Sequence, residues 1–189
     1  IRPSQTSPTI TLSGPPQLLQ RMVAYFERIR QLPLSEVGKY GKTHLWPVFI
    51  FSARRAQSAH LNWTAPHVLG SLSYPPPIVV LNPEEESQYR DNWPTAIFCI
   101  TPMENYGISF CRWIVHSSFS WRLPYYWSFD DNIVAFDAVH QGRPSQPVTF
   151  RDALFHVQRL SNIADFALTG YLRATGTESC KVRHNPTIS

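Results

Sequence analysis

The sequence contains few cysteines for its length. Only Cys99, Cys111 and Cys180 occur among the 189 residues, and no two of them have the spacing of a CxxC motif. An odd number of cysteines without such a pair argues against a disulfide framework and against a zinc site. We therefore expect a protein of a reducing compartment, the cytosol or the nucleus.

Long apolar runs and several common enzyme motifs are also missing. No apolar run reaches the length of a membrane span, and the first residues lack the pattern of a secretory signal, so no membrane partner is expected. The chain has no GxGxxG after a predicted strand, no P-loop and no GxSxG motif, and its seven histidines show no metal-ligand spacing. These absences disfavour a dinucleotide fold, a P-loop nucleotidase and an α/β-hydrolase.

Acidic residues are scarce, which makes their placement informative. Thirteen acidic residues compare with seventeen lysines and arginines, and a net charge of +4 is too small to prove a nucleic-acid partner. Basic residues dominate positions 1–55, which suits either a solvated face or an anionic partner. Despite this scarcity, Asp130 and Asp131 are adjacent. Adjacent like charges cost free energy unless a positive group offsets them.

The chain contains enough apolar material for a folded core, with 43% hydrophobic and 13% aromatic residues. Residues 1–16 and 173–189 are predicted to be flexible tails, and residues 17–172 to form one domain. Four apolar runs, rich in β-branched and aromatic residues, predict strands that are buried on both faces. They are PVFIFSA from Pro47, PIVVLNP at 77–83, TAIFCITP at 95–102 and PYYWSFD at 124–130.

Helical periodicity occurs before, between and after these runs. It predicts helices over 17–30, 107–119 and 150–172, and a shorter one over 56–65. Strands that alternate with helical connections predict an α/β domain with a mostly parallel sheet, flanked by helices.

Distinctive polar residues follow each predicted strand. The carboxyl ends of parallel strands lie at one edge of a sheet, and ligands bind beyond that edge, so we expect these residues to line one crevice. The sets, in strand order, are Ser52, Arg54 and Arg55; Asn82 and Glu84; Glu104, Asn105 and Gly107; and Asp130, Asp131 and Asn132.

The chemistry of these sets suits a nucleotide diphosphate. Arg54 and Arg55 are able to hold phosphate through bidentate hydrogen bonds. Gly107 opens a helix whose free N–H groups attract anions, and Arg112 reaches the same place from the first turns of that helix. The acidic cluster at 130–132 suits Mg²⁺ or Mn²⁺, which would offset its charge. Each feature alone also has a structural explanation, since Asp and Asn favour turns and paired arginines occur on surfaces.

The order of four sequence blocks resembles the TET/JBP-associated glycosyltransferases, a GT-A-type family that includes enzymes adding sugar to hydroxymethylated bases. The blocks are PVFIFSARRA, VVLNPEEESQYRDNWP, ITPMENYGISFCRWIV and YYWSFDDNI, within residues 46–172. The resemblance implies a Rossmann-like GT-A sheet, a UDP-sugar donor and a divalent metal, Mn²⁺ or Mg²⁺. It places Asp130, Asp131 and Asn132 at the metal-binding DxD-type position. The expected donor-binding residues are Ser52, Arg54, Arg55, Glu84, Asn105, Gly107, Arg112 and Asp130.

Two departures from the family pattern affect the expected function. Asn132 replaces the last acidic residue of the DxD-type motif, which should lower metal affinity. The sequence also ends soon after the helix at 150–172, where GT-A enzymes continue into the acceptor pocket. No catalytic base is therefore assigned, and the chain is expected to be a fragment, a donor-binding half or a degenerate member.

The resulting expectation is a glycosyltransferase, or its nucleotide-sugar-binding half, in an intracellular and nuclear location. It would transfer sugar from a UDP-sugar to the hydroxyl group of a modified DNA base or of a nuclear protein's Ser or Thr. The alternative is a catalytically inactive GT-A-like scaffold or binding module in transcription regulation. A nucleotidyltransferase, whose carboxylates would also hold a metal, is a more remote option.

Overall fold

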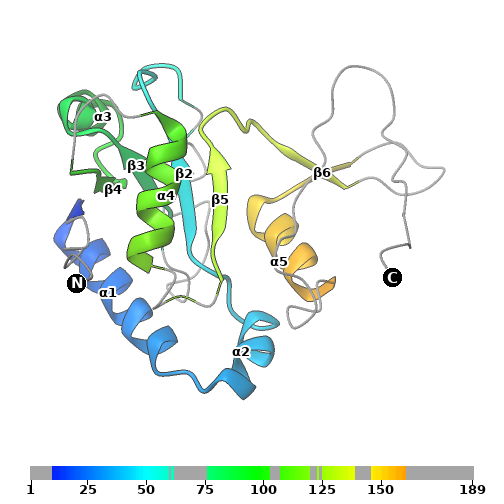
Figure 1. Cartoon of the computed structure of the whole chain (residues 1–189). Coiled ribbons are helices and arrows are strands. Elements are labelled where there is room, and N and C mark those ends of the chain that lie inside the picture. The colour runs from blue at the N-terminus through cyan, green and yellow to red at the C-terminus, as the bar shows by residue number, and fades with distance from the viewer. Residues whose placement is uncertain are drawn as a thin grey trace, which may run out of the picture.

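The computed structural model describes residues 10–59, 61, 76–102, 107–119, 123, 125–138 and 146–160 (Figure 1). The helices are α1 (Pro16–Arg30), α2 (Leu34–Gly41), α3 (Glu86–Asn92), α4 (Ile108–Phe119) and α5 (Phe150–Leu160), with the short 3-10 helix η2 (Pro83–Glu85) before α3. The strands are β1 (Thr11–Ser13), β2 (Val48–Phe51), β3 (Ile78–Leu81), β4 (Ile97–Ile100), β5 (Trp127–Asp130), β6 (Phe136–Ala138) and β7 (Gln146–Val148).

Five of the described strands form one sheet in the order β1-β4-β3-β2-β5. The pairs β4–β3, β3–β2 and β2–β5 are parallel, and only the edge strand β1 is antiparallel to its neighbour. The predicted mostly parallel α/β sheet is therefore confirmed, and the four apolar runs contain β2, β3, β4 and β5. A separate hairpin of β6 and β7 follows the sheet, and the sequence pattern did not predict it.

Other segments differ in detail from the expected boundaries. The segment 1–16, expected to be a tail, contains β1, which pairs with β4. Residues 56–58 form a turn, closed by hydrogen bonds from Ser58 and Ala59 to the carbonyl oxygen of Arg55, and most of the helix expected at 56–65 lies outside the described residues. The final helix is described as far as Leu160, and the expected tail at 173–189 lies outside the described residues.

The alternation of side chains along the strands divides the core into two layers. Phe49 on β2 contacts Phe119 of α4, and Phe119 contacts Phe26 of α1, so these helices cover one face of the sheet. Figure 1 shows α4 lying across that face in front of β2. On the other face, Tyr89 of α3 packs against Phe98 of β4. Every residue of β2, β3 and β4 is buried, as expected for strands covered on both sides.

The strand order creates a topological switch point between β2 and β5. The chain adds β3 and then β4 on one side of β2, and α4 then returns it to the other side, where β5 pairs with β2. Loops that leave neighbouring strands in opposite directions open a crevice at their carboxyl ends. No helix in the described part of the chain is long and apolar enough to cross a membrane.

A single buried amide joins α5 to the start of this sheet. The Oε1 atom of Gln158 accepts hydrogen bonds from Trp46 N (3.1 Å) and Trp127 Nε1 (2.8 Å). Its Nε2 atom donates to the carbonyl oxygens of Gly41 (2.8 Å) and His44 (3.0 Å). The amide thus satisfies four polar groups, which would otherwise be buried without partners.

Replacing Gln158 by leucine keeps the volume of the side chain and removes all four hydrogen bonds. We expect Gln158→Leu to lower the free energy of unfolding by roughly 2–4 kcal/mol, because buried polar groups lose their partners. Urea denaturation followed by circular dichroism measures this. Gln20→Leu, at an exposed position of α1, is the matched control and should change stability by less than about 0.5 kcal/mol. Equal effects of the two substitutions would contradict the role of Gln158.

Candidate functional site

Most of the residues predicted from the strand ends come together at the switch point. Ser52, Arg54 and Arg55 follow β2. Asp130 ends β5, where its register places it opposite Phe51, and Asp131 follows that strand. Arg112 reaches the same edge from α4, and Glu84 of η2 lines a pocket together with Arg54 and Arg55. Gly107 is exposed immediately before α4, and its carbonyl oxygen accepts the first hydrogen bonds of that helix. Asn132 is exposed after β5, and Asn105 lies outside the described residues.

The two adjacent aspartates point to opposite faces of the sheet. Asp130 lies on the α4 side, where its Oδ1 atom accepts a hydrogen bond from Arg112 Nη2 at 2.6 Å. Asp131 lies on the α3 side, where its Oδ1 atom is 3.2 Å from Arg55 Nη1. Successive side chains of an extended strand alternate between faces, and here each carboxylate obtains its own arginine. In the described structure, two arginines therefore offset the paired negative charges.

The two ion pairs differ in their exposure to solvent. The side chains of Arg112 and Asp130 are each 48% exposed, so solvent screens this pair and ligands have access to both members. Asp131 is almost completely buried, and its second oxygen, Oδ2, accepts a hydrogen bond from the hydroxyl group of Ser52. Asp131 is therefore fixed within the protein, whereas Asp130 remains accessible.

The loop after β2 contains an unusual backbone conformation. Arg54 has a φ of +57°, the only positive value among the described non-glycine residues. Its backbone N–H donates to Oε1 of Glu85, a buried carboxylate in η2. The other oxygen of Glu85 accepts from Asn82 Nδ2 (3.3 Å), and Asn82 Oδ1 accepts from Thr101 Oγ1 (3.3 Å). Left-handed backbone is costly for residues with a Cβ, so these contacts from the ends of β3 and β4 hold the loop in place.

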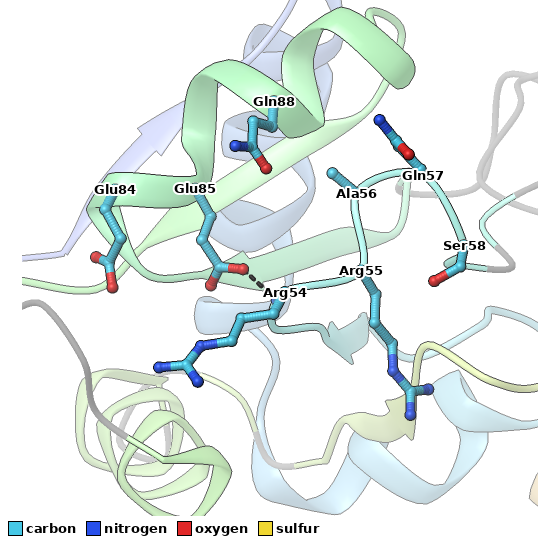
Figure 2. A pocket seen from close by; sticks show the side chains of 8 residues that line it. All are labelled: Arg54, Arg55, Ala56, Gln57, Ser58, Glu84, Glu85 and Gln88. Carbon is cyan, nitrogen blue, oxygen red and sulfur yellow. Dashed lines mark hydrogen bonds between the residues drawn. The ribbon is translucent and has the colours of Figure 1, made fainter.

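A pocket lies beside this loop. It has a volume of about 560 Å³ and is lined by Arg54, Arg55, Ala56, Gln57, Ser58, Glu84, Glu85 and Gln88. Figure 2 shows that Arg54 and Arg55 extend from the loop in different directions, with Glu85 facing Arg54. The size suits a small organic ligand, and the amide, hydroxyl and guanidinium groups suit a polar one.

The described residues fit a divalent metal only in part. Asp131 is committed to Ser52 and Arg55, and no group of three or more His, Cys, Asp or Glu side chains in the described part of the chain is arranged to hold a metal ion. Asp130 is accessible, and Asn132 is exposed two residues later. Mg²⁺ is usually bound by one or two carboxylates together with substrate phosphates. Asp130 and Asn132 therefore offer accessible oxygen atoms, but they do not complete a metal site by themselves.

Sequence reasoning missed three residues that shape the site: Glu85, Tyr89 and Thr101. The sequence reads Glu84-Glu85-Glu86 at this point, and a shift of one residue decides which carboxylate faces the loop. Glu85 is the buried one, whereas Glu84 is exposed in the pocket lining. Tyr89 is completely buried in α3, and its sequence pattern gave no indication that its hydroxyl group reaches the end of β2.

An α/β sheet with arginines and carboxylates at its switch point, and a pocket beside the loop after β2, is typical of enzymes that bind nucleotide-type anions. A model of the TET-associated glycosyltransferase family matches residues 46–186, which is most of the chain. The chain therefore belongs to the TET-associated glycosyltransferase family, and the resemblance inferred from its sequence is confirmed. Membership implies a glycosyltransferase and a sugar donor. Searches of curated proteins and of solved structures found no match.

The positive φ of Arg54 gives a test of the loop geometry. Arg54→Gly and Arg54→Val both remove the guanidinium group, but only glycine adopts the left-handed region at little cost. We expect the glycine variant to be more stable than the valine variant by about 1–2 kcal/mol in urea denaturation. The same pair of substitutions at Gln20, within α1, should show the opposite order, because glycine is the poorer helix former. The same order at both positions would argue against a left-handed Arg54.

Proposed function

We propose that the switch point binds the diphosphate of a UDP-sugar and that the chain is the donor-binding part of a glycosyltransferase. The observation that supports this proposal is the presence of Arg54, Arg55 and Arg112, from two separate elements, around the carboxyl ends of β2 and β5. Guanidinium groups bind phosphate oxygens with two parallel hydrogen bonds. The neighbouring pocket, with its amide and hydroxyl groups, would take another part of the nucleotide-sugar.

The proposed role of the arginines extends to the transfer step. When an acceptor hydroxyl attacks the anomeric carbon, the bond to the diphosphate oxygen breaks and negative charge grows on the leaving nucleotide. Preorganised cationic groups aimed at that charge lower the barrier. Arg112 lies next to the accessible Asp130, and Arg55 lies on the other side of β5, so both sides of the β5 end would carry positive charge.

We further propose that a divalent metal ion, Mn²⁺ or Mg²⁺, binds together with the donor. Asp130, with Asn132 after it, would supply protein oxygens, and Asp131 would support the site from the opposite face of the sheet. When bound, such an ion would stabilise the departing diphosphate as a Lewis acid. Arg112 would then turn from Asp130 towards a phosphate oxygen, since one carboxylate oxygen would be needed by the ion.

Only the family resemblance supports a proposal for the acceptor. A hydroxylated DNA base and a protein Ser or Thr are the two candidates, and either would suit a nuclear protein. A second function, an inactive GT-A-like scaffold or binding module in transcription regulation, is favoured by one observation. Both carboxylates of the DxD-type motif form ion pairs with arginines, an arrangement that is complete without a ligand.

Binding of UDP separates these functions. We expect calorimetry to detect UDP binding in the presence of Mn²⁺ and to show about tenfold weaker binding for Arg55→Ala and for Arg112→Ala, because each loses a charge-assisted hydrogen bond. Arg30→Ala, which removes an exposed arginine of α1 paired with Glu27, is the control and should bind normally. Failure of the wild-type protein to bind UDP in any condition would favour the scaffold. Release of labelled sugar from UDP-sugars would establish turnover.

The two aspartates should respond differently to substitution. Asp130→Asn should weaken Mn²⁺ binding, measured by electron paramagnetic resonance with UDP present, while leaving the unfolding transition nearly unchanged, because Asp130 is accessible. Asp131→Asn should lower the free energy of unfolding by about 1–3 kcal/mol, because its buried contacts to Ser52 and Arg55 weaken. If both variants lost Mn²⁺ binding to the same extent and neither lost stability, the two aspartates would share one role. That result would contradict the separate roles assigned to them here.

A further inference from the structure

A closed circuit of hydrogen bonds begins and ends at Arg55. The backbone N–H of Arg55 donates to the hydroxyl oxygen of Tyr89 at 3.1 Å, and that hydroxyl group bonds to Oγ of Ser52. The Ser52 hydroxyl bonds to Oδ2 of Asp131, and Oδ1 of Asp131 accepts from Nη1 of Arg55 at 3.2 Å. Ser52, Tyr89 and Asp131 are all buried, whereas the side chain of Arg55 is 50% exposed.

The direction of each bond follows from the number of hydrogens available. An ionised carboxylate only accepts, so Ser52 must give its single hydroxyl hydrogen to Asp131. Ser52 can then only accept from Tyr89, and Tyr89 donates its own hydroxyl hydrogen to Ser52 while accepting from Arg55 N. Burial raises the pKa of Tyr89 above its ordinary value, which keeps this hydroxyl group protonated. Every bond in the circuit therefore has one defined donor.

We propose that Tyr89 is a positioning residue that holds Arg55 in the conformation that binds the donor's diphosphate. This inference rests on the proposed function. Tyr89 fixes the backbone of Arg55 directly, and it fixes the guanidinium group through Ser52 and Asp131. The ring of Tyr89 is anchored by its packing on Phe98 of β4. Trp93, the residue that follows α3, donates from Nε1 to the carbonyl oxygen of Ala56 at 3.0 Å and so holds the loop at a second point.

Positioning matters here because arginine side chains are long and flexible. A free arginine loses rotamer entropy when it binds a phosphate, and a side chain that is already ordered loses less. In the circuit one edge of the Arg55 guanidinium is held by the buried Asp131, while half of the side chain remains exposed to solvent. Contacts in the protein interior thus order the Arg55 side chain, and its exposed part is available to the ligand.

Tyr89→Phe tests the circuit itself. The substitution keeps the ring and its packing on Phe98 and removes only the hydroxyl group that accepts from Arg55 N. We expect faster hydrogen exchange at the Arg55 amide in nuclear magnetic resonance spectra of the ligand-free protein, because this amide loses its acceptor. Tyr126→Phe is the matched control, since Tyr126 is half-buried at the opposite end of β5 and its hydroxyl group lies 3.4 Å from His116 Nδ1. An unchanged Arg55 amide in Tyr89→Phe would overturn the proposal.

A double-substitution cycle tests the consequence for binding. With UDP and Mn²⁺ as the probe, we expect Tyr89→Phe to weaken binding about five- to tenfold in calorimetry and to have no further effect in the Arg55→Ala background. Ser52→Ala, which breaks the circuit at another link, should behave in the same way. Equal weakening in both backgrounds would mean that Tyr89 acts through general stability, and this would overturn the proposal.

The experiments distinguish failure of the positioning role of Tyr89 from failure of the proposed UDP-binding function. If wild-type protein binds UDP and Arg55→Ala weakens it, but Tyr89→Phe does not, only the positioning role fails. If wild-type protein does not bind UDP, the proposed function fails, and the donor-positioning role of Tyr89 fails with it. The Arg55 amide exchange would still report whether the circuit exists as a structural feature.

Discussion

The parallel pairing of β2 with β5 is the contact on which the candidate site depends. It places the loop that contains Arg54 and Arg55 next to the two aspartates at the end of β5 and directly after it. The pairing exists because β3 and β4 add to the far side of β2, and α4 then carries the chain back across the sheet. The same return brings Arg112 to the carboxyl edge. A different strand order with the same elements would separate these charged side chains.

Side-chain alternation determines how the acidic pair is used. Because neighbouring residues of a strand face opposite sides of the sheet, Asp130 meets Arg112 on the α4 side and Asp131 meets Arg55 on the α3 side. One carboxylate thereby becomes part of the buried framework, and the other remains available to ligands. This division gives a physical reason for an adjacent acidic pair in a chain with few acidic residues.

Buried polar groups at the strand ends build the site before any ligand arrives. Ser52, Asn82, Thr101 and Asp131 follow or end the four parallel strands, and each is buried and hydrogen-bonded to a partner from another element. Unpaired groups of this kind would destabilise the fold, whereas a satisfied network specifies one arrangement. In this member of the TET-associated glycosyltransferase family, the arginine loop is therefore hydrogen-bonded to its neighbours at its base, and its two arginines are exposed.

The sequence by itself determined the sheet strands, their parallel direction and the polar character of their ends, because buried runs such as IVVL at 78–81 have few other stable environments. It also carried the family resemblance through its motif blocks. The short edge strand β1 and the β6–β7 hairpin left too weak a pattern to be predicted, since three-residue strands show almost no periodicity. Only the tertiary structure decided that Glu85 rather than Glu84 holds the loop and that Tyr89 reaches Ser52. It also decided that Asp130 and Asp131 point to opposite faces of the sheet. Those outcomes depend on the strand register and on which face each side chain takes, and both are set by packing between segments that are distant in the sequence.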